Sequence, residues 1–117
     1  MSRSWALLVA LLVCGLGAAP ARAETTPTSS IAQVMVLEPS DASYKLFHGA
    51  IWLDHDKAQW NYRWGGLACK GRELSDTNVQ LLFSAFRTEY QVTLEYVVTD
   101  YKGKPYRCIT GITVSRT

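Results

Sequence analysis

The stretch SDTNVQLLFSAFRTEYQVTLEYVVTDYKGKPYRCITGITVSRT, residues 75–117, decides the fold of this chain. Its first part predicts a helix over residues 75–90, because the hydroxyl of Ser75 can accept a hydrogen bond from the exposed amides of the first turn. Apolar side chains then recur at helical spacing; they are Val79, Leu82, Phe83, Phe86 and Tyr90. A face of this width packs against a sheet, so we expect the first four of these side chains to be largely buried.

A hairpin of two strands follows the helix directly. Residues 91–99 alternate between apolar and polar side chains, with Val97 as the exception. This alternation is the period of a strand with one buried face. The Asp-Tyr-Lys-Gly-Lys-Pro sequence of residues 100–105 then predicts a turn, and residues 106–115 form the final strand.

Three more strands are predicted upstream of the helix, over residues 31–37, 43–53 and 59–64, separated by turn sequences. Five strands with a helix between the third and the fourth follow the order of the OB-fold. The sequence therefore predicts a mainly β protein with one helix, folded as a five-stranded OB-fold-like barrel over residues 31–117. An open five-stranded sheet with one packed helix is the alternative. Residues 24–30 are polar and predict a loose arm in front of this domain.

The N-terminus has the features of a secretory signal peptide over residues 1–23. Arg3 gives a basic start, residues 5–17 are an unbroken apolar run, and the Ala-Arg-Ala sequence at residues 21–23 supplies the small residues that signal peptidase requires. The apolar run is shorter than the ~20 residues of a membrane-spanning helix. We therefore expect a secreted or periplasmic protein without membrane insertion. A lipid anchor on Cys14 is the alternative.

Two cysteines, Cys69 and Cys108, remain after removal of the signal peptide. An even pair in an oxidising compartment predicts a disulfide. Such a bond would close a loop of about forty residues and contribute ~4 kcal/mol in the chain-entropy model. The alternative is a metal site completed by His48 and His55, for which the sequence has neither a C-x-x-C nor an H-x-x-H spacing. We expect a disulfide, no bound metal and no cofactor.

The charge of the exported chain is balanced. The full sequence has 12 Lys and Arg against 10 Asp and Glu, and removal of Arg3 and Arg22 leaves ten of each sign. A nucleic-acid-binding protein normally carries a basic face. We therefore do not expect a nucleic-acid partner.

The sequence offers little for catalysis. Asp54, His55 and Asp56 are adjacent at a predicted hairpin tip, where neighbouring side chains point in different directions and Asp is an ordinary turn residue. The chain contains no nucleophile-elbow, zinc-protease or phosphate-loop motif. We do not expect an enzyme.

Aromatic side chains are the most suggestive feature for binding. Trp60, Tyr62 and Trp64 fall on one face of the predicted third strand. Aromatic rings stack on the apolar face of a sugar, and the interleaved Asn61 and Arg63 can bond its hydroxyls. The same alternation is typical of side chains that face a core. These three aromatic residues are therefore candidates for a ligand site, and the core remains the alternative.

Residues 75–117 resemble the B subunits of bacterial AB5 toxins. The cholera and heat-labile enterotoxin B subunits have a similar run of a long helix, an alternating strand, a turn with Lys and Pro, and a terminal strand of the type seen here at residues 109–114. The order of elements is also similar to that of the subtilase-cytotoxin and pertussis-like B subunits. The resemblance implies an OB barrel, a homopentamer whose helices line a central pore, binding of cell-surface glycans, and a toxin A-type subunit as partner.

The resemblance also indicates candidate residues. The enterotoxin subunits stack galactose on a Trp in the turn after the post-helix strand; this chain lacks that Trp and has Tyr101 nearby, while Lys104 roughly matches a family lysine. Sialic-acid-binding relatives use a Ser near the start of the first strand, which makes Ser30, or its neighbour Ser29, a candidate. We expect a secreted or periplasmic glycan-binding module. A small protein-interaction domain, such as an enzyme inhibitor, is the alternative.

Overall fold

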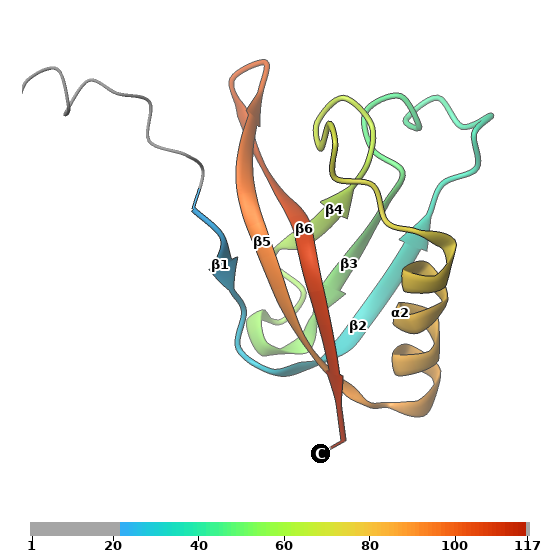
Figure 1. Cartoon of the computed structure of the whole chain (residues 1–117), viewed down its shortest axis with the longest axis vertical. Helices are drawn as coiled ribbons and strands as arrows, with labels where there is room; N and C mark the ends of the chain where they lie inside the picture. The colour runs from blue at the N-terminus through green and yellow to red at the C-terminus, as the bar shows by residue number, and fades with distance from the viewer. Residues whose placement is uncertain (1–21, 117) are drawn as a thin grey trace, which may run out of the picture.

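A computed structural model of the protein describes residues 22–116 and contains six strands and two helices in this part of the chain (Figure 1). The strands are β1 (Glu24–Thr25), β2 (Ser29–Val36), β3 (Gly49–Leu53), β4 (Asn61–Trp64), β5 (Gln91–Tyr101) and β6 (Lys104–Ser115). The helices are the short 3-10 helix η1 (Asp54–Asp56) and the α-helix α2 (Asp76–Thr88). A mainly β fold with one α-helix is therefore confirmed. The predicted signal peptide lies outside the described residues, except for Arg22 and Ala23.

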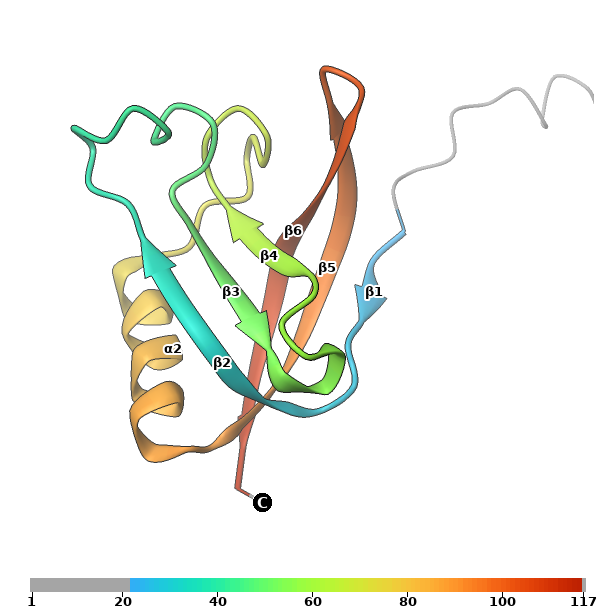
Figure 2. The ribbon, with the colours of Figure 1, turned by 180° about the vertical axis from the view of Figure 1, so that it is seen from behind.

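The strands pair in a closed ring (Figures 1 and 2). Strand β2 pairs with β3, β3 with β4, and β5 with both β2 and β6, all antiparallel. The ring closes where β4 and β6 run parallel and meet at one residue pair, Arg63 and Cys108. Strand β1 pairs with β5 beside the start of β2 and completes a six-stranded sheet.

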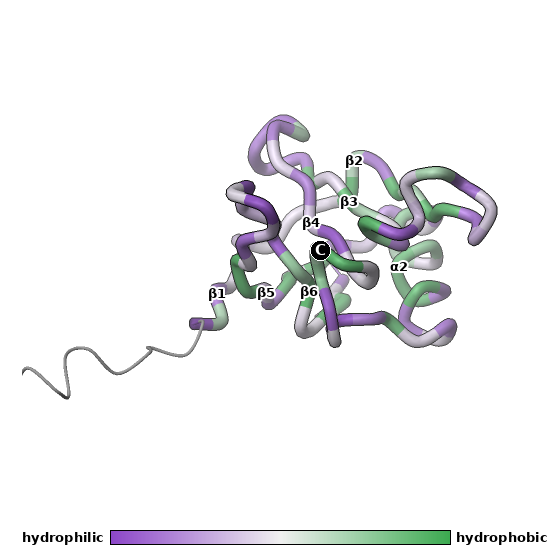
Figure 3. Tube along the Cα trace, turned by 90° about the horizontal axis from the view of Figure 1, so that it is seen from above, coloured by the Kyte–Doolittle hydropathy of each residue, from purple (hydrophilic) through white to green (hydrophobic). Residues whose placement is uncertain are grey.

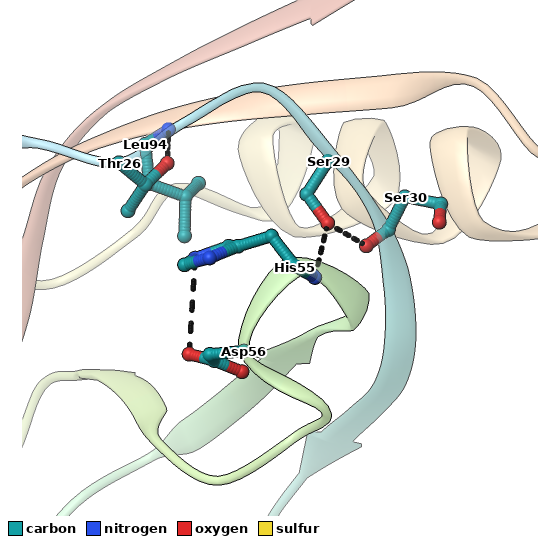
Figure 4. Close-up of polar contacts among 6 residues, drawn as sticks. All are labelled: Thr26, Ser29, Ser30, His55, Asp56 and Leu94. Atoms are coloured by element: carbon teal, nitrogen blue, oxygen red, sulfur yellow. Dashed lines mark hydrogen bonds and ion pairs between the residues drawn. The ribbon is translucent and has the colours of Figure 1, made fainter.

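Residues 24–30 contain β1 and the first two residues of β2, which pair with β5, where the sequence predicted a loose arm. Thr26 is buried, and its hydroxyl accepts a hydrogen bond from the amide of Leu94 at 3.0 Å. Ser29 is also buried; its hydroxyl accepts from the amide of His55 at 3.0 Å and donates to the carbonyl of Ser30 at 2.8 Å (Figure 4). The hydroxyls of Thr26 and Ser29 bond backbone groups, and those of Thr28 and Ser30 bond the side chains of Thr93 and Asp54, which is why a polar sequence is held in place.

The second predicted strand is shorter than expected, because its first part is a series of turns. Strand β3 begins only at Gly49, whereas the prediction began at residue 43. The carboxylate of Asp41 accepts a hydrogen bond from the amide of Ser43 at 2.8 Å, a side-chain turn that competes with an extended strand. Gly49 itself lies under the ring of Trp64, where an added Cβ would approach the ring to 2.1 Å. The glycine therefore serves close packing at the start of the strand.

The core lies inside the ring and under α2. Its buried members are Ile31, Ile51, Leu53, Tyr62, Trp64, Leu82, Ala85, Val92, Leu94 and Ile109. They come from every strand of the ring and from α2, so the ring and the helix share one core. In the described part of the chain, no helix is long and apolar enough to cross a membrane.

Helix α2 begins after Ser75 as its sequence predicts, ends at Thr88 rather than at residue 90, and buries a narrower face. The hydroxyl of Ser75 accepts from the amide of Asn78 at 3.2 Å, which confirms the N-cap. Leu82 and Ala85 are fully buried against the sheet, whereas Phe83 is 38% exposed and Phe86 is 41% exposed. The prediction that these two phenylalanines are buried is wrong for the single chain, because α2 packs chiefly on the one strand β2. In Figure 3, hydrophobic residues (green) recur along α2, which lies beside the strands.

The predicted disulfide is confirmed. Cys69 and Cys108 are bonded, both are buried, and their Cα atoms are 5.5 Å apart. The bond joins the loop after β4 to the position at which β6 pairs with β4. Val97 and Tyr106 pack against it and form a second, smaller apolar cluster.

Loss of the disulfide should lower the free energy of unfolding by about 4 kcal/mol, because the bond restricts a 39-residue separation in the unfolded chain. Urea unfolding of the wild type and of the Cys69→Ala/Cys108→Ala double variant measures the difference. Reduction of the wild type by dithiothreitol is the control and should give a similar loss. A loss below about 1 kcal/mol in both experiments would contradict the prediction.

Leu82→Ala should lower the free energy of unfolding by about 2–5 kcal/mol, because a fully buried leucine leaves a cavity. Phe83→Ala should cost much less in the monomeric protein, since that ring is already 38% exposed. The two variants are compared by urea unfolding at a protein concentration too low for self-association. Equal losses would show that the helix buries a different face from the one described.

Candidate functional site

A groove opens where β4 and β6 separate from their single pairing. It has a volume of about 430 Å³ and lies between the start of β4 and the β5–β6 hairpin. Figure 1 shows this hairpin extending beyond the rest of the sheet. The lining residues are Gln59, Trp60, Asn61, Arg63, Val98, Pro105, Tyr106 and Arg107. The groove therefore brings together the segment before β4 and the first residues of β6.

Trp60 presents the largest exposed ring in the groove. Its side chain is 43% exposed, and the guanidinium carbon of Arg107 lies 4.3 Å from the centre of its ring. An arginine stacked on a tryptophan face is attracted by the electron-rich ring. This contact holds Trp60 and Arg107 side by side at the surface.

Arg63 is held from three sides. Its guanidinium carbon lies 4.1 Å from the ring centre of Phe47 and 5.0 Å from that of Tyr106. Its Nε donates a hydrogen bond to Oδ1 of Asn61 at 2.9 Å. Burial lowers the pKa of Arg63 below its ordinary value, but an arginine side chain stays protonated at neutral pH. The groove thus contains a charged group in a fixed position.

The chemistry of the groove suits binding. Aromatic faces come from Trp60 and Tyr106, amide donors and acceptors from Gln59 and Asn61, and positive charge from two arginines. Apolar surface with a few well-placed polar groups is the usual composition of a small-molecule site. Within residues 22–116, no group of three histidine, cysteine or acidic side chains is arranged to hold a metal ion.

The structure places the three aromatic candidates Trp60, Tyr62 and Trp64 in two different environments. Tyr62 and Trp64 are each only 3% exposed and belong to the core. Trp60 precedes β4 and is exposed. The core interpretation therefore holds for Tyr62 and Trp64, which offer no face to a ligand, and only Trp60 stays a candidate.

The hairpin candidates lie beyond the groove. Tyr101 is paired with Lys104 across a two-residue turn in which Lys102 and Gly103 have φ of 50° and 80°. Such positive values are typical of the tight turns that join paired strands. The Nζ atom of Lys102 lies 5.5 Å from the ring centre of Tyr101. Neither Tyr101 nor Lys104 is among the residues that line the groove.

Ser30 lies in a different hollow, of about 460 Å³, whose lining includes Asp54, Phe86 and Glu89. Its hydroxyl donates a hydrogen bond to Oδ2 of Asp54, so this group already has a partner within the chain. The structure therefore does not bring Ser30 together with Trp60. Three candidate positions from the sequence fall in three places: the groove, the hairpin tip and the hollow beside α2.

The Asp54-His55-Asp56 sequence forms the 3-10 helix η1. Nε2 of His55 lies 3.7 Å from Oδ2 of Asp56, as Figure 4 shows. Neither carboxylate oxygen of Asp56 has a hydrogen-bond partner among the described residues. The segment makes a turn between β3 and β4, as its sequence predicts, and Ser29 and Ser30 tie it to β2.

Tyr106 and Arg107 line the groove and were not among the sequence candidates. They follow the hairpin turn and precede Cys108 in β6. Phe47 lies in the turn region before β3 and reaches Arg63 only through the folding of that loop.

The pKa values of Tyr62 and Tyr96 are raised above that of a free tyrosine. Burial, together with the carboxylate of Asp56, raises the pKa of Tyr62 to about 12. Tyr96, whose ring centre lies 5.1 Å from that of Tyr62, also has a raised pKa because of burial and Glu24. The Tyr62 phenol is therefore held neutral well above the pH at which a free tyrosine ionises, and the shift of Tyr96 has the same direction.

The free energy of unfolding should fall as the pH rises from about 10 to about 12. In this range tyrosines of the unfolded chain ionise, whereas Tyr62 stays neutral in the folded state until about pH 12. Thermal unfolding as a function of pH measures the fall, and tyrosinate absorbance follows the ionisation. Tyr62→Phe should reduce the fall. The exposed Tyr90→Phe control should retain it, and equal behaviour of the two variants would refute the assignment.

Comparison of the chain with protein-family models, with curated proteins and with solved structures found no match.

Proposed function

We propose that this protein is an exported glycan-binding module and that the groove at Trp60 is its binding site. The observation that carries the proposal is the exposed Trp60 ring, set in one hollow with the amides of Gln59 and Asn61 and with two arginines. A flat ring can cover the apolar face of a sugar while the amides and guanidinium groups bond its hydroxyls. The Cys69–Cys108 disulfide supports export, because such bonds persist in oxidising compartments.

We also propose that the ring of five strands is an OB-fold barrel. The strand order supports this, with the parallel contact of β4 and β6 and a helix between the third and fourth strands of the ring. OB-folds bind oligosaccharides on the face of their second and third strands, between the first and last loops. Here the third strand is β4, and the last loop is the β5–β6 hairpin. The groove lies between these two elements, which is where an OB-fold would place a sugar.

The proposal includes the assembly that the AB5 B subunits suggest: a homopentamer that presents several glycan sites and can receive a toxin A-type subunit. Exposed apolar side chains at helical spacing support a self-association surface, because a monomer rarely leaves a contiguous apolar patch uncovered; they are Phe83 and Phe86 of α2 and Tyr90, two residues after its end. The mass of the purified protein in native mass spectrometry tests the ring of five.

A protein-interaction domain, such as an enzyme inhibitor, is the second candidate function. The same exposed face of α2 favours it, because an apolar helix face can dock on a partner protein instead of on a second copy. A monomeric mass together with no glycan binding would favour this candidate over the first.

Trp60→Ala should abolish glycan binding, since it removes the only exposed tryptophan ring among the described residues that line the groove. Tyr101→Ala should leave binding nearly unchanged, because Tyr101 lies outside the groove. A glycan array, run on the assembled protein because single weak sites gain from multivalency, measures both variants. Loss of binding in Tyr101→Ala but not in Trp60→Ala would move the site to the hairpin tip. No binding by the wild type would refute the glycan proposal.

A further inference from the structure

Arg107 connects the groove to the N-terminal strand β1. Its guanidinium carbon lies 4.3 Å from the ring centre of Trp60 and covers part of that ring, which still leaves the side chain 43% exposed. The described residues that line the groove include no acidic side chain. A negative group that attracts Arg107 therefore has to lie outside the lining, and its position decides where the guanidinium rests.

Strand pairing brings such a group to the same side of β5. Residues directly opposite each other in antiparallel strands share a face, and so do residues two apart in one strand. Arg107 pairs with Val98, and Tyr96 lies two residues before Val98. Glu24 of β1 pairs directly with Tyr96, where β1 runs alongside β5 (Figure 1). Glu24, Tyr96 and Arg107 therefore point to one side of β5, with Tyr96 in the middle.

The pKa of Tyr96 responds to both of these neighbours. Burial raises the pKa of the phenol, Glu24 raises it further, and Arg107 lowers it. A phenol oxygen can donate one hydrogen bond and accept another, so the Tyr96 hydroxyl can serve the carboxylate and the guanidinium together. Among the described residues, Glu24 and Arg107 form no direct ion pair. Tyr96 is therefore the link between them.

The ring of Tyr96 is itself fixed by the core. It packs against the buried apolar cluster inside the strand ring, and its centre lies 5.1 Å from that of the buried Tyr62 in an edge-to-face contact. A hydrogen bond to a charged group contributes more than a cation–π contact at an exposed site. Tyr96, more than Trp60, therefore decides where the Arg107 side chain rests.

We propose that β1 controls the groove: Glu24, acting through Tyr96, holds Arg107 over Trp60 and so sets how much of the Trp60 ring is open to a ligand. Glu24 and Tyr96 are positioning residues, because neither lines the groove. The predicted cleavage after residue 23 would leave Glu24 at the amino end of the exported chain. This control goes beyond the proposed glycan function, because it concerns the groove itself and applies to any ligand that needs the Trp60 ring.

Collisional quenching of tryptophan fluorescence tests the control without any ligand. Trp60→Phe measures the background from the two other tryptophans of the exported chain, Trp52 and Trp64. Iodide should quench Trp60 more than caesium does, each scaled to its quenching of free N-acetyltryptophanamide, because a nearby positive charge attracts the anion. Arg107→Gln should bring this ratio close to one and raise quenching by neutral acrylamide, since the ring loses its cover.

Substitutions of the positioning residues distinguish control from packing. Tyr96→Phe keeps the ring and removes only the hydroxyl, and Glu24→Thr removes the carboxylate from β1. Both should raise acrylamide quenching of Trp60 toward the value of Arg107→Gln. Glu95→Gln is the matched control, because Glu95 adjoins Tyr96 in β5 and faces the other side of the strand; its quenching should equal that of the wild type. Circular dichroism checks the fold, and if one positioning variant does not fold, the other decides.

Four outcomes would overturn the control by β1. They are unchanged quenching in Arg107→Gln, unchanged quenching in both positioning variants, an equal rise in Glu95→Gln, and a rise in Tyr96→Phe without one in a folded Glu24→Thr. None of these measurements involves a sugar. A wild type that binds no glycan would therefore refute the proposed function and leave the control by β1 to the quenching results alone.

Discussion

The closure of the ring at one residue pair is the constraint on which the rest of the structure depends. Strands β4 and β6 meet only at Arg63 and Cys108, a single parallel contact where the other neighbouring strands of the ring have at least two. At this same position Cys108 is bonded to Cys69. A covalent bond therefore secures the junction of the ring that has the fewest paired residues.

The groove is a consequence of the same junction. Beyond Cys108 the hairpin leaves β4, and the space between them fills with stacked arginine and aromatic side chains. Arg63 bridges the loop before β3 and the start of β6, while Arg107 covers Trp60. These cation–π contacts join the two sides of the groove, where β4 and β6 pair at one residue only. The same residues thus stabilise the structure and line the proposed binding groove.

Helix α2 stabilises the fold with a small part of its apolar surface. Leu82 and Ala85 reach the core, and the phenylalanines beside them remain at the surface. The helix therefore has two apolar surfaces: one completes the core of the chain, and the neighbouring one is exposed to solvent. The exposed face and the groove lie on different elements, so the proposed assembly and the proposed ligand binding would not compete for the same residues.

The sequence alone determined the mainly β class, the order of the elements from β2 onward and the capped helix, because alternation and capping depend on residues close together in the chain. It also determined the pairing of Cys69 with Cys108, because only these two cysteines remain after removal of the predicted signal peptide. Alternation placed Tyr62 and Trp64 on one face of the strand. It could not show that this face points into the core or that Trp60 is exposed, since both depend on how the sheet curves in three dimensions. Likewise, helical spacing found the apolar side of α2, but only contact with β2 decided which residues are buried. The groove was out of reach of the sequence, because Trp60, Arg107 and Phe47 come together only when the ring closes.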